Sequence, residues 1–151
     1  MENVDQTIEV AINKFQVVML RLNKEIVEIV KETGLANLLS REQIEAMRII
    51  QTEGKVTINE LATLQNIFKT AASKRVAKLE DMGYVQRAHS DNKRIKLIML
   101  SSEGEAFLKE ATTVITKAVK ARLGNKFTTD EIEQFVDQLT HIDEVFRESK
   151  S

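Results

Sequence analysis

Lysine and arginine side chains gather in one short stretch of this sequence, between residues 68 and 96. The stretch holds eight basic and three acidic residues, whereas the whole chain of 151 residues has a formal net charge of −1. Ammonium and guanidinium groups bind phosphates, and they also donate hydrogen bonds to guanine O6 and N7 in the major groove of DNA. A local cationic surface on an otherwise acidic chain is typical of a protein that binds nucleic acid.

Part of this basic stretch has the spacing of an amphipathic helix. After Ile67, the residues Ala72, Val76 and Leu79 recur at steps of four and three, which predicts a helix with one buried face. The opposite face is small and polar near its start and cationic along its length: Thr70, Ser73, Lys74, Ala77 and Lys78. The major groove admits such a helix. We expect Lys74 to reach base edges, Lys69 and Lys78 to bind phosphates, and Thr70 and Ser73 to bind either.

A period of two residues begins directly after Gly83 and predicts a β-hairpin. Its strands would be YVQRAH and IKLIML, and its tip the polar segment from Ser90 to Arg94, where Asp91 favours a turn. An arginine at such a tip can enter the narrow minor groove, where the negative potential is greatest. The predicted DNA-binding residues are thus Lys69, Thr70, Ser73, Lys74, Lys78, Arg87, Lys93 and Arg94.

Catalytic and metal-binding chemistry has little support in the sequence. The chain has no cysteine, which excludes thiol catalysis, zinc–thiolate sites and disulfides. Its two histidines, His89 and His141, are too dispersed to predict a metal site. No nucleophile is paired with a base, and no glycine-rich phosphate loop occurs. We therefore expect no enzyme activity, no cofactor and no metal.

The helix and the hairpin belong to a longer order of elements between residues 40 and 101. Ser40 with Gln43, and Thr57 with Glu60, have the spacing of capping boxes and predict two further helices. Their expected inner faces are Ile44, Met47 and Ile50, and Leu61, Ala62 and Leu64. Two helices joined by a tight turn and followed by a hairpin form a winged helix-turn-helix. The sequence thus predicts a mainly α fold with one β-hairpin; we call residues 40–101 the winged unit.

Long helices are predicted on both sides of the winged unit. In residues 3–33 the apolar residues alternate at steps of four and three, the rhythm of helix-on-helix packing: Ile8, Ile12, Phe15, Met19, Leu22, Ile26 and Ile29. Residues 102–148 would form two more helices, the first starting at Ser101 or Ser102 and the second at the box of Thr128 and Glu131. A second copy of the chain is the simplest partner for these faces. Packing on the chain's own C-terminal helices is the alternative, and the two can hold together.

The length of the chain and its hydropathy pattern limit the kinds of protein it can be. At 151 residues it is expected to be a single domain, 1–151, long enough to bury a core. The N-terminal segment MENVDQTIEV has no basic and apolar regions of a signal peptide, and no apolar run approaches the length of a membrane span. We therefore expect a cytoplasmic protein.

The sequence allows two interpretations of the function of the winged unit. The unit either binds DNA or serves as a protein-interaction module without DNA binding. Cationic residues on the basic helix, together with Arg94, favour DNA, because the core of a protein-docking face is depleted of lysine.

At residue level, the chain resembles the MarR family of bacterial transcription regulators over the stretch ELATLQNIFKTAASKRVAKLEDMGYVQRAHSDNKRIKLIMLSSEG. The residues that match the family pattern are Leu79, Glu80, Gly83, Tyr84, Val85, Arg87, Arg94, Leu100 and Gly104. The resemblance implies a homodimer, built by dimerisation helices in residues 3–33 and 102–148, on a pseudo-palindromic double-stranded DNA operator. It further implies a recognition helix in the major groove, the hairpin, or wing, in the minor groove, and a regulator that acts as a repressor.

The sequence departs from the family pattern at three positions. Phe68 stands where the family usually has a polar helix cap, Asn92 replaces the acid of the wing tip with Asp91 one place earlier, and Ser101 replaces a threonine. The first two concern operator preference rather than the fold. Because the chain lacks cysteine, a thiol switch is excluded. The remaining choices are a small-molecule effector in a cleft between the dimer helices and the winged unit, or no effector.

Overall fold

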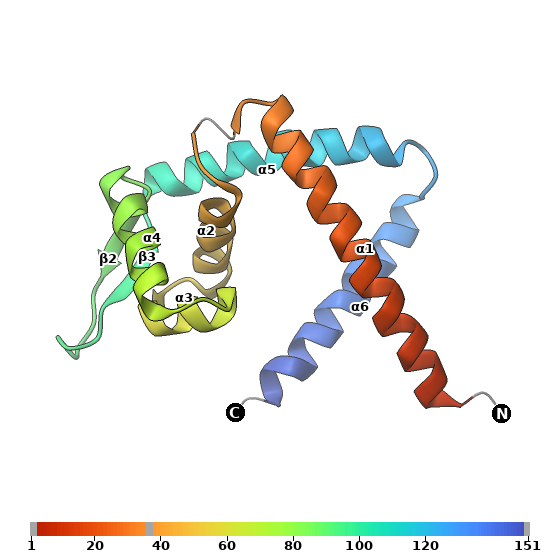
Figure 1. The fold of residues 1–151 in the computed structure, drawn as a ribbon, viewed down its shortest axis with the longest axis horizontal. Coiled ribbons are helices and arrows are strands. Elements are labelled where there is room, and N and C mark those ends of the chain that lie inside the picture. Colours follow the sequence, from red (N-terminus) through yellow and green to blue (C-terminus); the bar gives the residue numbers. More distant parts are fainter. Residues whose placement is uncertain (1–2, 36–37, 150–151) are drawn as a thin grey trace. The chain divides into compact units, whose positions relative to one another are not determined.

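The computed structural model describes residues 3–35 and 38–149, and within them it contains six helices and three short strands (Figure 1). The elements are α1 (Val4–Glu32), α2 (Arg41–Glu53), β1 (Val56–Thr57), α3 (Ile58–Gln65), α4 (Lys69–Asp81), β2 (Val85–Ala88), β3 (Leu97–Leu100), α5 (Ser102–Leu123) and α6 (Thr129–Glu148). The predicted mainly α fold with a hairpin is confirmed. The chain divides into two compact units, residues 1–115 and 116–151, with the boundary inside α5.

Side-chain caps fix the starts of several helices, as their sequences predict. Ser40 Oγ accepts from the backbone N–H of Gln43, while Gln43 Oε1 accepts from the N–H of Ser40, so the box of α2 is complete. Thr128 and Glu131 form the same reciprocal pair at α6. At α3, the Thr57 hydroxyl accepts from the N–H of Glu60 at 3.1 Å and donates to the Glu60 carboxylate. The pairs at α2 and α6 each satisfy two backbone donors that a helix start leaves open, whereas the pair at α3 satisfies the N–H of Glu60 and forms only half of the predicted box.

The hairpin is part of a three-stranded antiparallel sheet with the order β1-β3-β2. Val85 pairs with Leu100 and Ala88 with Leu97, while Val56 pairs with Ile98 on the other edge of β3. Strand β1 was not predicted, because two residues are too few to display a period of two. It ties the segment between α2 and α3 to the hairpin.

One core joins all elements of the winged unit. Its buried residues come from the helices, the strands and the start of α5: Leu39, Ile44, Ala46, Met47, Ile50, Val56, Leu61, Val76, Leu79, Val85, Ile98, Leu100 and Leu108. The predicted inner residues of α2 and α4 are therefore buried. The prediction that Leu64 faces inward is wrong, because its side chain is 47% exposed. Successive helix residues lie about 100° apart, so Leu64 falls about 60° outside the arc that Leu61 and Ala62 bury.

The junction between the hairpin and α5 is tightly built. The Ser101 hydroxyl donates to the carbonyl of Gly83 and accepts from the N–H of Gly104, so Ser101 is the residue that caps α5. The Tyr84 carbonyl accepts from the N–H of Ser101 at 3.0 Å. A Cβ on Gly104 would lie 2.0 Å from that carbonyl oxygen, so this position has no room for a side chain. The Tyr84 ring packs on Phe107 with ring centroids 4.9 Å apart.

A smaller cluster attaches the end of α1 to α5. It consists of the buried Val30, Leu35 and Ala111 with four half-buried neighbours, Ile26, Phe107, Val114 and Ile115. Nearer its start, α1 keeps its apolar residues exposed, among them Ile8, Ile12 and Phe15, each about half exposed. In α6 no described residue is buried. None of the described helices is both long and apolar enough to cross a bilayer.

Candidate nucleic-acid interface

Helix α4 separates its two faces as its sequence predicts. Ala72, Val76 and Leu79 are buried against the rest of the winged unit. The residues predicted to contact DNA are exposed on the other side: Lys69, Thr70, Ser73, Lys74 and Lys78. The inward stripe therefore fixes α4 on the core and leaves its cationic face open to a partner.

The start of α4 differs from the other helix starts of the winged unit. Its N-cap residue, Phe68, makes no side-chain hydrogen bond and is 85% exposed. The first turn contains no acidic residue and begins with Lys69, whereas α2 and α3 carry Glu42 and Glu60 there. A carboxylate near a helix start is stabilising, and a missing polar cap costs about 0.5–2 kcal/mol. The α4 start therefore lacks two usual sources of helix stability and keeps a positive potential.

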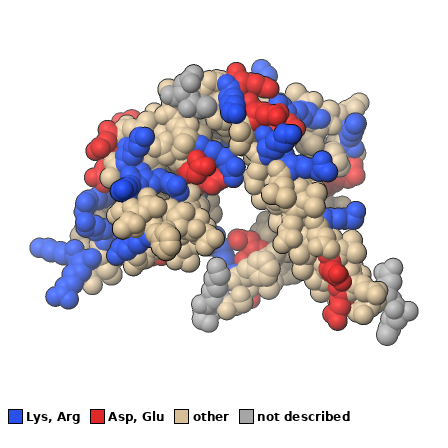
Figure 2. Space-filling model, viewed as in Figure 1, with Lys and Arg blue, Asp and Glu red and all other residues tan. Residues whose placement is uncertain are grey.

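Asn92 orders the tip of the wing. Its Oδ1 accepts from the N–H of Arg94 at 3.0 Å, and its carbonyl accepts from the Ser90 hydroxyl and from the N–H of Ile95, each at 3.0 Å. The Asn92 amide thus forms the turn in the same way that an aspartate carboxylate could at this position. Lys93 and Arg94 are exposed at this tip. Figure 2 shows basic side chains projecting from the end of the hairpin.

A groove of about 460 Å³ separates α4 from the wing. It is lined by Thr57, Ile58, Asn59, Lys69, Ser73, Arg94, Ile95 and Lys96. Lys69 from the start of α4 and Arg94 from the wing thus face one space, although 25 positions separate them in the sequence. Lys96 was counted in the basic stretch but not assigned to the site. The sequence signal that could have assigned Lys96 to the site is its position between the wing tip and β3.

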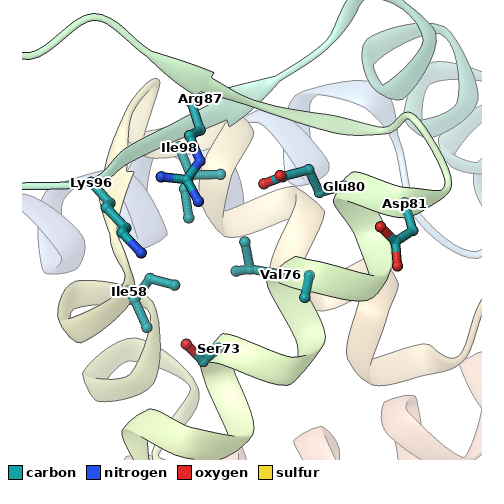
Figure 3. A pocket seen from close by; sticks show the side chains of 9 residues that line it. Ile58, Ser73, Val76, Glu80, Asp81, Arg87, Lys96 and Ile98 are labelled. Carbon is teal, nitrogen blue, oxygen red and sulfur yellow. The ribbon is translucent and has the colours of Figure 1, made fainter.

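Arg87 lies in a neighbouring pocket of about 260 Å³ between α4 and the sheet (Figure 3). The Arg87 and Lys96 side chains enter it from the hairpin, and the Ser73 hydroxyl enters it from α4 (Figure 3). Glu80 points toward the Arg87 guanidinium, while Asp81 lies farther from it (Figure 3). Ser73 and Lys96 line this pocket as well as the groove. Thr70, Lys74, Lys78 and Lys93 line neither of these two cavities and lie on the open surface.

Metal ligands do not gather in the part of the chain that the structure describes: no group of three or more acidic or histidine side chains is placed to hold an ion there. His89 lies on the hairpin arm, with its Nε2 3.4 Å from Asp91 Oδ1, and both side chains are almost fully exposed. The chemistry of the site is therefore that of exposed cations, hydroxyls and backbone donors, which suits a phosphate backbone.

A helix-turn-helix with an adjoining β-hairpin defines the winged-helix class of proteins. The model of the MarR family matches residues 39–96. The uncharacterized HTH-type transcriptional regulator YdgG of Bacillus subtilis (strain 168) is 33% identical over 116 residues, which cover 75% of this chain and 71% of that protein.

Among solved structures, a MarR family protein from Bacillus stearothermophilus has a TM-score of 0.71 at 19% identity, covering 97% of this chain and 99% of that chain. A mutant MarR from E. coli complexed with operator DNA has a TM-score of 0.60 at 18% identity, covering 87% of this chain and 95% of that one. At these low identities, the two structural similarities show a shared fold.

The chain belongs to the MarR family of transcriptional regulators, whose DNA-binding part is a winged helix. The resemblance found in the sequence is thereby confirmed. The names of its relatives also agree with the expectation that it is not an enzyme.

Proposed function

We propose that this chain is a homodimeric, sequence-specific regulator that places α4 in the major groove of a pseudo-palindromic operator and the wing in the adjacent minor groove. The groove shared by Lys69 and Arg94 carries this proposal. Because a phosphate strand separates a major groove from the neighbouring minor groove, cations on both walls of one protein groove suit the strand between them.

The exposed apolar faces of the terminal helices support the dimer. α1 and α6 each carry large apolar residues that are about half exposed, such as Ile12, Phe15, Phe135 and Ile142. Contiguous apolar surface of this kind marks an interface. A second copy of the chain presents the same faces, and a two-fold dimer would present two winged units to two half-sites.

We expect repression, because a dimer bound across a promoter would exclude the polymerase from it. A small-molecule effector between the dimer helices and the winged unit remains a prediction. Its test is ligand binding to the full dimer with and without operator DNA.

The test begins with selection of genomic DNA fragments by the purified protein, followed by titration of the selected duplex at increasing salt. We expect specific retention that falls steeply with salt, since each neutralised phosphate contributes a slope of about −0.9 in log K against log salt. Absence of retention at any salt would favour the protein-interaction module.

Two variants separate reading of bases from binding of phosphates. Arg94→Ala should weaken binding to most sequences, because the wing cation no longer enters the minor groove. Lys74→Ala should also change base preference, by about 1–3 kcal/mol at the affected pair. Lys109→Ala, an exposed lysine of α5 outside the basic stretch, is the matched control. A uniform loss across sequences with Lys74→Ala would make Lys74 a phosphate contact.

A further inference from the structure

Arg75 lies in the middle of α4, yet its guanidinium is held by another helix. Its Nη1 donates to Oε1 of Gln65, the last residue of α3, at a distance of 2.7 Å. Arg75 and Gln65 are both half-buried, whereas Lys74 and Lys78 on the same helix are exposed. Hydrogen bonds from a charged donor are short and strong. The charged group of Arg75 is therefore engaged inside the winged unit, unlike those of its basic neighbours.

Gln65 extends this link to a third helix. Its Nε2 donates to the backbone carbonyl of Glu42, in the first turn of α2, at 3.2 Å. The chain turns directly after Gln65, because Asn66 adopts a left-handed conformation with a φ of 55°. A single amide thus bridges α2 and α4 at the point where the helix-turn-helix bends.

We propose that Gln65 and Arg75 are positioning residues, which set the angle of α4 on α2 and α3 and thereby direct its exposed face at the DNA. This inference rests on the proposed function. Arg75 itself contacts no phosphate, although it belongs to the basic stretch. Its contribution to DNA binding is geometric, and it acts through the placement of residues such as Ser73 and Lys74.

The amide at position 65 suits this role better than a carboxylate. Oε1 accepts from Arg75 while Nε2 donates to the Glu42 carbonyl, and a carboxylate has no proton for the second bond. A neutral partner also brings no negative charge to the helix-turn-helix. The link therefore positions α4 without reducing the cationic potential that attracts DNA.

The closing experiment compares Arg75→Met, Gln65→Met, the double variant and Lys78→Met on the duplex selected by the wild-type protein. Methionine keeps an unbranched stem and removes the polar contacts. Arg75→Met and Gln65→Met should each weaken binding by about three- to tenfold. Both should keep the wild-type salt slope, whereas Lys78→Met should reduce that slope by about 0.9. The double variant should bind no worse than the weaker-binding single variant, because, among the described residues, Arg75 acts on the other helices only through Gln65.

A second measurement needs no DNA. Each single variant should lower the melting temperature by roughly 2–4 °C, and the double variant should lower it no further than the larger single effect. Arg41→Met is the matched control: it removes a half-buried arginine whose Nε lies 2.9 Å from Glu45 Oε1, one turn along the same helix. An ion pair between residues four positions apart on one helix contributes little to stability and joins no two elements, so the melting temperature should change by about 1 °C.

Two results would overturn the inference. A salt slope reduced by about 0.9 in Arg75→Met would make Arg75 a phosphate contact. Melting shifts of Gln65→Met and Arg75→Met that simply add would show that the two residues act independently. If the wild-type protein retained no duplex, the proposed function would fail, while the melting cycle would still decide whether the link holds α4 in place.

Discussion

The winged unit buries most of its apolar residues, whereas α6 and the first part of α1 leave theirs exposed. Met47, Ile50 and Leu61 are fully buried, while Phe15 of α1 and Phe135 of α6 are 50% and 54% exposed. Both regions have helical apolar spacing, so the difference lies in what covers the apolar face. The sheet, α2, α3, α4 and the start of α5 cover one another in the winged unit. The described part of α6 and the first part of α1 have the same kind of face without such a cover.

The difference between a buried and an exposed apolar face distinguishes residues that stabilise the fold from residues available for association. A core closed within the chain makes the stability of the winged unit a property of one chain. In the proposed dimer, the exposed apolar stripes would make the stability of the terminal helices depend on protein concentration, because mass action couples folding to association. Substitutions in the winged unit should therefore lower its folding stability, whereas substitutions in the terminal helices should weaken association.

The largest effect is expected from Gly104→Ala. Its new Cβ would lie 2.0 Å from the Tyr84 carbonyl oxygen and 2.9 Å from the carbonyl carbon, and both are backbone atoms that cannot rotate aside. We expect a loss of about 3 kcal/mol or more in the free energy of unfolding, measured by chemical denaturation.

Gly124→Ala is the control for this clash. Nothing lies within 4 Å of a Cβ there, but the φ of Gly124 is +63°, so only backbone strain of about 1–2 kcal/mol is added. Equal losses in the two variants would show that the junction between hairpin and α5 relaxes around the methyl group.

Phe135→Glu should break assembly and leave the winged unit folded. It places a charge in the apolar stripe of α6, which consists of Ile132, Phe135, Leu139, Ile142 and Phe146. Sedimentation should show single chains, and affinity for the full operator should fall by about a hundredfold or more, because the two half-sites are no longer bound together. Amide exchange in α2 and α4 should stay slow.

Gln134→Glu adds the same charge one residue away, outside this stripe, and should remain a dimer. If Phe135→Glu also sedimented as a dimer, α6 would lie outside the interface between copies.

Local signals made most of the fold predictable from the sequence. Ser40 with Gln43 and Thr128 with Glu131 marked two helix starts, because a capping box needs only residues three positions apart. The buried stripe of α4 and the hairpin were likewise visible as periods of a few residues. The exposed cations of α4 and the wing could be named for the same reason.

Long-range features were not predictable in this way. Gln65 contacts residues 23 and 10 positions away, and no periodicity encodes such a bridge. Strand β1 owes its existence to pairing with β3 rather than to its own two residues. The meeting of Lys69, Arg94 and Lys96 in one groove depends on the crossing of α4 and the hairpin, which spacing alone does not give.

Phe68→Ser should stabilise the winged unit without changing assembly. The serine hydroxyl would cap α4, whose N-cap residue makes no side-chain hydrogen bond, and the phenyl ring lost is 85% exposed. We expect a gain of about 0.5–1 kcal/mol in the free energy of unfolding. Phe68→Ala removes the ring without adding a cap and should leave stability nearly unchanged. A serine variant less stable than the alanine variant would mean that the ring packs on a neighbour.

The smallest effect concerns the pH dependence of α6, and it distinguishes the two complete capping boxes. The backbone N–H of Thr128 donates to Glu131 Oε1 at 2.9 Å, and this bond, followed by the Thr128 hydroxyl, holds the pKa of Glu131 below its usual range. A carboxyl whose pKa is lower in the folded state stabilises it at pH values above the unfolded pKa, and this contribution is lost as the pH falls through the folded pKa. The box of α2 uses Gln43, which does not titrate.

Glu131→Gln should therefore give α6 the pH behaviour of α2. The variant should melt slightly below the wild type at neutral pH, and the difference should shrink as the pH falls through the range where Glu131 gains its proton. Thermal melts of both proteins between neutral and acidic pH test this, and Glu103, whose pKa is also lowered by hydrogen bonds, cancels because both proteins retain it. A difference that stays constant over this range would mean that the charge of Glu131 contributes nothing to the helix start.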